Sequence, residues 1–432
     1  MHTFRSLLAY LALAAAVLAL LPGMATLGAF AVGLAVILGW RELRRVPRAV
    51  FLVAMAGLVY SVLWNPSLLS DATGNVTRLA GLILSVMLLS HVLGRTDDLR
   101  RLSASLFGGR PTGRYLSLAF GTALVSIPLN FGSVAVVGSL VADRIHRHGD
   151  SAATRNATRA VLRGFGTTPT FSPLSISVVL TLTLLPGLGS LTLLSLALPF
   201  AVVMLLAGLI WREPEPAADD QGIPAGAGPW LRFGGLILGI CLGVFLLSHQ
   251  YGLNYGHAVT LSCLAAVIGG RLLAWSRRQN PPLANMAPVS NELAIVGGSA
   301  FIGSVISGVV LGHIEGDLAL PAWGWAALAA AVPWVYFLAG VAGINPIVIG
   351  TLVGGILGSV WPGAALIGLG LGMVTGWGIT AFGTPFAANA LIMERLTGYR
   401  AMDASFFWSL RLSLCGLCLA SLLAAGLTVG LV

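Results

Sequence analysis

Long apolar runs dominate this sequence from one end to the other. A helix that crosses the hydrocarbon core of a bilayer needs about 20 such residues. Apolar runs of this kind occur at about 6–21, 24–40, 49–64, 76–93, 115–142, 160–185, 191–210, 231–249, 257–275, 291–312, 323–360, 364–394 and 404–430. Only 9% of the residues are charged, against roughly 25% in a soluble domain. A chain so poor in charge cannot cover a surface in water, which excludes a soluble enzyme, a nucleic-acid-binding protein and a disordered protein. The sequence predicts an all-α polytopic membrane protein.

The positions of the arginines predict the topology. All 24 basic residues are Arg, most of them in short loops, and such residues mark the cytoplasmic side. With the N-terminus inside, a single crossing by 115–142 would place the five arginines of 143–163 outside. The conflict disappears if 115–142, interrupted at Pro128 and Asn130, is a re-entrant hairpin with arms of about 12 residues. We expect Asn130 to cap the second arm, and 323–360, interrupted at 340–346, to be a second hairpin that enters from outside.

This topology has about 11 transmembrane helices and two re-entrant hairpins, with the N-terminus cytoplasmic and the C-terminus outside. Its segments are an N-terminal membrane hairpin (1–47), a first repeat (48–210, with hairpin 115–142 and broken helix 160–185), a cytoplasmic linker (211–230), a connecting span (231–256) and a second repeat (257–432, with hairpin 323–360 and broken helix 364–394). The four-residue spacing of Arg155, Arg159 and Arg163 predicts an amphipathic helix on the cytoplasmic interface over 143–163. Arg163 either ends this helix or lends its charge to a bound anion.

Three landmarks recur in the two halves at a nearly constant offset. They are Asn75 and Asn291, Asn130 and Asn345, and Phe165-Gly166-Thr167 and Phe382-Gly383-Thr384. One such coincidence could be chance. Three of them, together with hairpins that enter from opposite faces, predict two inverted-topology repeats, an arrangement common in secondary transporters.

Gly and Pro interrupt both predicted broken helices, at GFGTTPTFSP (164–173) and at TAFGTPFAAN (380–389). A proline kink would explain either one alone, but two matched breaks after two matched hairpins favour a binding site. Backbone groups that a helix break leaves without hydrogen bonds persist in a membrane only where protein or water bonds to them. Helix N-termini at such breaks favour anions, and carbonyl oxygens suit Na⁺. The neutral polar side chains at these places are Ser126, Asn130, Ser133, Thr167, Thr168, Ser172, Asn345, Thr384 and Asn389. The possible Na⁺ sites are at Asn130, Gly166, Asn345 and Gly383. Without a deep carboxylate, cation symport is favoured over proton antiport.

This plan resembles the ion transporter superfamily, and in particular its divalent-anion–sodium symporter branch, over about residues 48–430. The resemblance implies a homodimer in which a scaffold half fixes the dimer and a transport half (about 115–190 and 323–395) moves as an elevator. It also implies that the hairpin tips and broken spans bind one anion between two Na⁺ sites. Carried over, the anion-binding role falls on Ser126, Asn130, Thr167, Thr168, Asn345, Thr384 and Asn389. The tips read SIPLN and AGINP, where those symporters carry Ser-Asn-Thr, and arsenite or citrate permeases and the large membrane subunit of tripartite transporters share the plan.

The sequence therefore predicts a secondary, Na⁺-coupled carrier of a small organic or inorganic anion in a bacterial inner membrane, with no cofactor other than the coupling ion. The alternative is the membrane subunit of a tripartite transporter that depends on a binding protein. A membrane-embedded enzyme would need a Ser/His, His/Glu or paired-Asp constellation within the spans, and none is visible in the sequence. The expected partners are the anion, membrane lipid and a second copy of the chain, with no nucleic acid.

Overall fold

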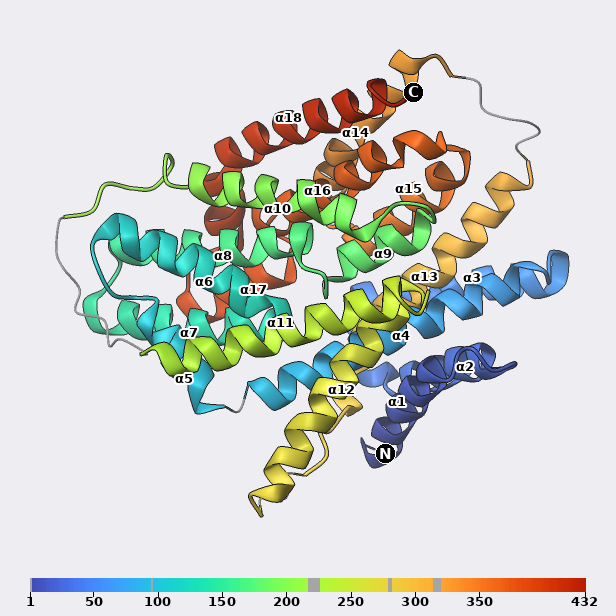
Figure 1. Ribbon diagram of the computed structural model, residues 1–432, viewed down its shortest axis with the longest axis horizontal. Coiled ribbons are helices and arrows are strands. Elements are labelled where there is room, and N and C mark those ends of the chain that lie inside the picture. The colour runs from blue at the N-terminus through green and yellow to red at the C-terminus, as the bar shows by residue number, and fades with distance from the viewer. Residues whose placement is uncertain (1, 95, 217–225, 279–281, 314–319) are drawn as a thin grey trace. The chain divides into compact units, whose positions relative to one another are not determined.

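The chain is helical in every regular element that the structure describes. The computed structural model describes residues 2–94, 96–216, 226–278, 282–313 and 320–432 (Figure 1). Within these residues, 10 helices are long and apolar enough to cross a membrane. The helices α1 (His2–Val17), α2 (Met24–Leu38) and α15 (Pro346–Val360) are apolar but shorter. This confirms the predicted class, an all-α polytopic membrane protein.

The chain divides into two compact units. Unit 1 consists of Met1–His91, Ile240–Ala319 and Ile347–Val360, and unit 2 consists of Val92–Gly239, Leu320–Pro346 and Trp361–Val432. The helix α11 (Ala227–His249) contributes residues to both units.

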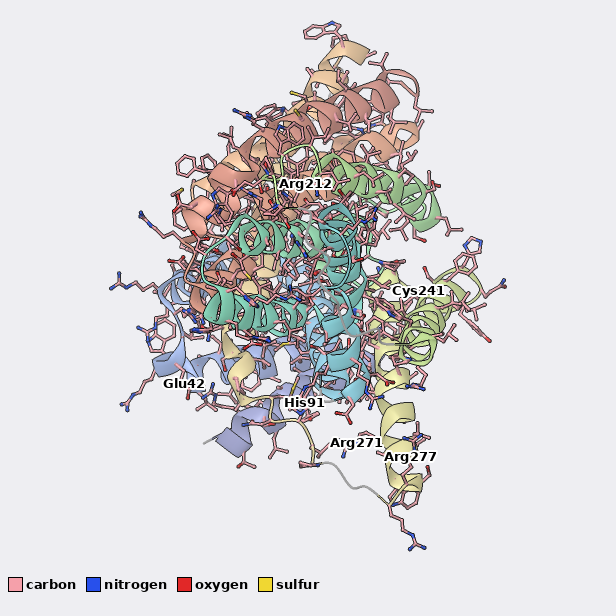
Figure 2. All side chains as sticks on the ribbon, turned by 90° about the vertical axis from the view of Figure 1, so that its left-hand side faces the viewer. Glu42, His91, Arg212, Cys241, Arg271 and Arg277 are labelled. Atoms are coloured by element: carbon pink, nitrogen blue, oxygen red, sulfur yellow. The ribbon has the colours of Figure 1, made fainter. Side chains whose placement is uncertain are left out.

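Unit 1 is built on α1 to α4 and on two later helices. Besides α1 and α2, it contains α3 (Arg45–Trp64), α4 (Leu68–Leu93), α12 (Tyr255–Ser276), α13 (Ser290–Leu311) and the 3-10 turns η1 (Trp40–Glu42) and η2 (Ala287–Val289). Arg5 is buried, and its guanidinium donates to a Glu42 carboxylate oxygen at 2.6 Å and to the Ala287 carbonyl at 2.7 Å. These bonds attach the N-terminal helices to the start of α13. Figure 2 labels Arg271, in the C-terminal part of α12, and Arg277, which directly follows this helix.

The second predicted hairpin is divided between the units. Its first arm, α14 (Ala322–Val341), belongs to unit 2, whereas 347–360 of α15 belongs to unit 1. Within unit 1, α15 packs closely on α13, because a side chain at Gly303 would lie 2.6 Å from the Thr351 hydroxyl. α14 alone, with 20 residues, is long and apolar enough to cross a membrane. Of the two arms, only α14 meets this length, and α15, with 15 residues, is shorter.

Unit 2 surrounds a central helix, α16 (Leu366–Gly383), all of whose residues are buried. An α-helix that is apolar on every side belongs inside a protein, and α16 packs against α8, α14 and α18 (Figure 1). The other elements of unit 2 are α5 (Asp97–Ser105), α6 (Pro111–Leu129), α7 (Phe131–His148), α8 (Ala152–Phe171), α9 (Ile176–Leu184), α10 (Ser190–Ala207), α17 (Ala388–Thr397), α18 (Trp408–Val429), the 3-10 turn η3 (Gly363–Ala365) and the π-helical segment η4 (Met402–Phe407).

The prediction of one amphipathic interfacial helix over 143–163 is wrong. α7 ends at His148, Gly149 has a φ of 74°, and Ser151 starts α8 with a capping box. Of the three arginines, Arg159 is 6% and Arg163 only 1% exposed. Their hydrogen-bond acceptors come from α6, α18 and the segment after α10, which the four-residue spacing cannot reveal.

Candidate functional site

The apolar run 115–142 covers most of α6 (Pro111–Leu129) and the first part of α7 (Phe131–His148), and the two helices are joined at Asn130. α6 and α7 contain 19 and 18 residues, more than the 12 expected of each arm, because both helices continue into their Arg-bearing outer ends. Asn130 has a φ of 48°, in a region that few non-glycine residues adopt. Its side chain makes no cap hydrogen bond to α7, so the expected capping role is wrong. Asn130 instead forms the turn, with a φ of 48° and a ψ of −129°, a conformation that glycine adopts more readily than residues with a side chain.

Buried hydroxyls line the inside of this turn. The Ser126 and Ser133 oxygens lie 2.6 Å apart, Ser126 donates to the Thr122 carbonyl at 2.6 Å, and Ser133 donates to the Asn130 carbonyl at 2.7 Å. Two hydroxyl protons cannot fill all three of these contacts at once. One of the three contacts is therefore without a hydrogen bond at any moment.

The first helix break lies later in the chain than predicted. α8 remains helical through Gly164–Thr168 and ends at Phe171, and α9 begins at Ile176. Ser175 caps α9 by accepting the Val178 N–H at 3.3 Å, while its hydroxyl lies 2.8 Å from the Ser172 carbonyl. The break thus occupies Ser172–Ser175, at the end of the predicted 164–173 segment.

The threonines that precede this break are bonded to backbone carbonyls. Thr167 donates to the Arg163 carbonyl at 2.9 Å, within α8. Thr168 donates at 3.2 Å to the Ala123 carbonyl of α6, and a side chain at Gly164 would overlap the Ala119 carbonyl of the same helix. The first arm of the turn and the first broken helix therefore pack backbone against backbone.

The second break occupies Thr384–Ala387, between α16 and α17, inside the predicted 380–389 segment. Asn389 donates to the Ala381 carbonyl at 2.9 Å, and Thr384 donates to the Thr380 carbonyl at 2.8 Å. Ser405 lies 2.8 and 2.9 Å from the carbonyls of Phe382 and Thr384. Sequence reasoning missed Ser405, because nothing near it in the chain shows that η4 returns to this break.

The second turn packs on the second break. Gly343 has a φ of 81°, and Asn345 immediately precedes α15. A side chain at Gly340 would lie 3.2 Å from the Thr384 methyl group, and one at Gly343 would lie 3.7 Å from the ring of Phe386.

The two FGT motifs meet where α8 crosses α16. A side chain at Gly166 would lie 2.6 Å from the Phe382 backbone nitrogen, and one at Gly378 would overlap the Thr170 hydroxyl. The ring of Phe131, the first residue of α7, lies 5.2 Å from that of Phe165. Within unit 2, the FGT segments of α8 and α16 therefore pack against each other, and the second turn lies against the second break.

One buried charge lies near this crossing. Arg163 donates to the Tyr115 hydroxyl at 2.8 Å, to the carbonyls of Gly208 and Trp408 at 2.9 Å each, and to the Ser409 hydroxyl at 3.3 Å. All four acceptors are neutral. Arg163 lies well inside α8 and does not end a helix, so that alternative is wrong. No group of three or more His, Cys, Asp or Glu that could hold a metal ion occurs among the described residues.

The architecture defines a class, the polytopic all-helical membrane proteins. Specifically, the chain is similar to the crystal structure of the YdaH transporter of Alcanivorax borkumensis, a transporter described as having an unusual topology. The TM-score is 0.56 at 16% sequence identity, over 86% of this chain and 88% of that one. At this identity the likeness shows the fold and does not select the divalent-anion–sodium symporter branch. No protein-family model and no curated protein matches the sequence.

Proposed function

We propose that this chain is a secondary active transporter that carries a small organic or inorganic anion by Na⁺-coupled symport. The observation that carries the proposal is the crossing of α8 and α16, where the two FGT motifs pack together and each precedes a break in its own helix. The fold shared with a transporter supports it.

The chemistry of the crossing suits an anion together with a cation. Helix N-termini carry partial positive charge, and those of α7, α9 and α17 follow a turn or a break. The buried guanidinium of Arg163 adds a positive charge whose hydrogen-bond acceptors are neutral. We assign the anion to Ser126, Asn130, Thr167, Thr168, Asn345, Thr384 and Asn389. Carbonyl and amide oxygens at Asn130, Gly166, Asn345 and Gly383 would coordinate Na⁺.

We further propose elevator-type alternating access in a homodimer in the bacterial inner membrane. Both breaks, the first turn and α14 lie in unit 2, which we propose as the moving part. Unit 1, with α1 to α4, α12 and α13, would fix the dimer. Inter-protomer crosslinks are then expected from 49–93 or 257–312.

Uptake by the purified chain in proteoliposomes tests the function. We expect an inward Na⁺ gradient to drive the accumulation of one member of a panel of labelled succinate, citrate, sulfate and arsenite, and a Na⁺ ionophore to abolish it. Thr168→Ala should lower this uptake, whereas Ser139→Ala, which removes a hydroxyl bonded only within α7, should not. Uptake driven by a pH gradient without Na⁺ would reject sodium coupling. Uptake that requires an added binding protein would favour the alternative, a tripartite membrane subunit.

A further inference from the structure

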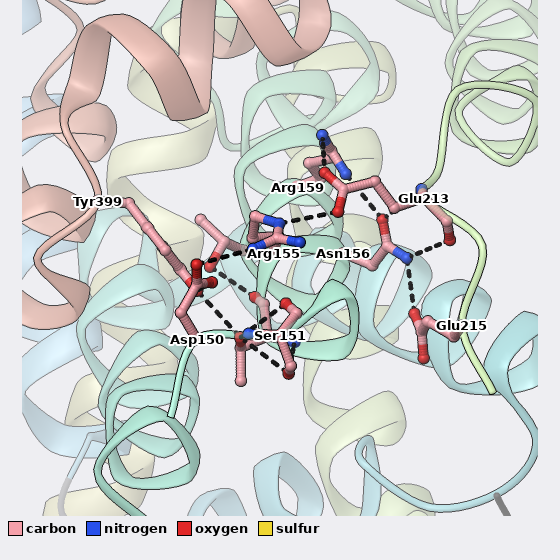
Figure 3. Close-up of polar contacts among 10 residues, drawn as sticks. Asp150, Ser151, Arg155, Asn156, Arg159, Glu213, Glu215 and Tyr399 are labelled. Carbon is pink, nitrogen blue, oxygen red and sulfur yellow. Dashed lines mark hydrogen bonds and ion pairs between the residues drawn. The ribbon is translucent and has the colours of Figure 1, made fainter. Parts of the chain in front are cut away.

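A second polar cluster lies in unit 2, on the N-terminal half of α8 (Figure 3). Its acids, Glu213 and Glu215, come from the segment that follows α10. Arg155 Nε donates to one Glu213 carboxylate oxygen at 2.8 Å, and Arg159 Nη2 donates to the other at 2.7 Å. Arg114, on α6, pairs with Glu215. Three arginines thus hold two carboxylates.

Asn156 recognises the backbone of the same segment. Its amide oxygen accepts the Glu213 N–H at 2.9 Å, and its amide nitrogen donates to the Glu213 carbonyl at 2.8 Å and to a Glu215 carboxylate oxygen at 2.7 Å. The bound segment reads Glu-Pro-Glu-Pro over 213–216 and has no regular structure. The cluster therefore binds these residues as a receptor binds an extended acidic peptide.

Contacts other than those with Glu213 and Glu215 also hold these side chains in place. The guanidinium of Arg159 lies over the ring of Trp408, 4.7 Å from its centroid, and donates to the Asn156 amide oxygen at 2.9 Å. Arg155 also pairs with Asp150 at 2.7 Å. Arg114 and Arg159 are both buried. Without Glu213, the buried Arg159 would lose its carboxylate partner, which is costly in a protein interior.

We propose that Arg114, Arg155, Asn156 and Arg159 form a binding site for a small carboxylate or oxyanion, and that Glu213-Pro214-Glu215 is its internal occupant. A free anion displaces this occupant and releases the segment from α8, the helix that carries the first FGT motif. The chemistry shared by the internal and the external ligand is an anionic oxygen pair that accepts from guanidinium groups. The site is distinct from the crossing of α8 and α16, and its existence does not depend on the transport function.

Thermal unfolding of the purified full-length chain tests the site. Glu213→Ala/Glu215→Ala empties it, and adding Arg159→Gln to that variant damages the receptor. Asp98→Ala, which removes an acid from the exposed ion pair with Arg232, is the control for loss of a surface acid. Each protein is titrated with succinate and with sulfate, with chloride at equal ionic strength as the reference, because a ligand of the folded state raises Tm by mass action.

We expect the emptied variant to gain Tm saturably with succinate or sulfate, at a concentration at least about tenfold below that needed by the wild type, which must first displace its own carboxylates. The added Arg159→Gln should abolish this gain, and Asp98→Ala should respond as the wild type does. Binding at the transport site would stabilise all these proteins alike and so remains distinguishable. Equal responses of wild type and emptied variant, or an equal effect of chloride, would overturn the proposal.

A second measurement covers the case in which the emptied variant does not fold. Pro214→Cys is made in a chain whose native cysteines are replaced by Ser, with Glu213 and Glu215 retained. Succinate or sulfate should speed maleimide labelling at 214 in a saturable manner, and chloride should not. A labelling rate that does not depend on the anion would reject displacement.

Discussion

At the scale of single residues, the backbone conformation at Asn130 limits which residue types can occupy this position of the candidate site. Its φ of 48° combined with a ψ of −129° lies outside the left-handed helical region and costs a residue with a side chain about 1–3 kcal/mol, whereas glycine adopts it without this cost. Asn and Ala both carry a Cβ, so we expect Asn130→Ala to leave the free energy of unfolding nearly unchanged and Asn130→Gly to raise it by up to about 1 kcal/mol. Thermal unfolding compares the two variants. Na⁺-dependent uptake by Asn130→Gly then tests the amide side chain. Lost uptake would support a ligand role for the amide, and normal uptake would mean that Asn130 serves only to form the turn.

Glu213 gives unit 2 an acid-sensitive contact. Burial alone would raise the pKa of Glu213, but hydrogen bonds from Arg155 and Arg159 and their positive charges outweigh burial and hold that pKa below its ordinary value. A carboxyl whose pKa is lower in the folded state stabilises the fold above its unfolded pKa and loses this contribution as pH falls through the folded pKa. We therefore expect Tm to fall less steeply between about pH 5 and pH 3 in Glu213→Gln than in wild type. Parallel curves for the two proteins would contradict the assignment.

At the scale of elements, the close crossing of α8 and α16 depends on glycine. A side chain at Gly166 would meet the backbone of Phe382, which cannot move aside as a flexible side chain could. We expect Gly166→Ala to destabilise the protein by about 1–3 kcal/mol through overpacking and to abolish uptake. Gly234→Ala is the control, because a side chain there would meet nothing within 4 Å. Equal stability of the two variants would mean that the crossing is loose.

Sequence reasoning located the breaks and turns well but could not supply their surroundings. The apolar runs predicted the helices because membrane length and hydropathy are local properties. The break after α8 was displaced toward Ser172–Ser175 because Ser side chains, not Gly and Pro alone, determine where a new helix is capped. Ser405, which binds carbonyls 21 and 23 residues earlier in the chain, and the burial of Arg159 follow from tertiary contacts that leave no periodic signal.

At the scale of the whole molecule, the prediction to test is that the two turns are reached from opposite sides of the membrane. Phe131 and Ile344, which are 40% and 44% exposed, lie at the first and second turn. Phe131→Cys and Ile344→Cys are made separately in a chain whose four native cysteines are changed to Ser. An impermeant thiol reagent is then applied to right-side-out and inside-out vesicles.

Positive-inside sorting predicts that 96–114 and 143–163 are cytoplasmic. The Phe131→Cys variant should then react from the cytoplasmic face in at least one transport state, and the Ile344→Cys variant from the outer face. Trp275→Cys, at a 72% exposed residue near Arg277 and Arg278, serves as the cytoplasmic reference. If the Phe131→Cys variant reacts from outside alone, α6 and α7 are two full crossings and the inverted repeat is wrong. If the Ile344→Cys variant reacts only from the cytoplasmic side, α14 is an ordinary span, which its length of 20 residues allows. The second hairpin is then wrong, and only the first remains.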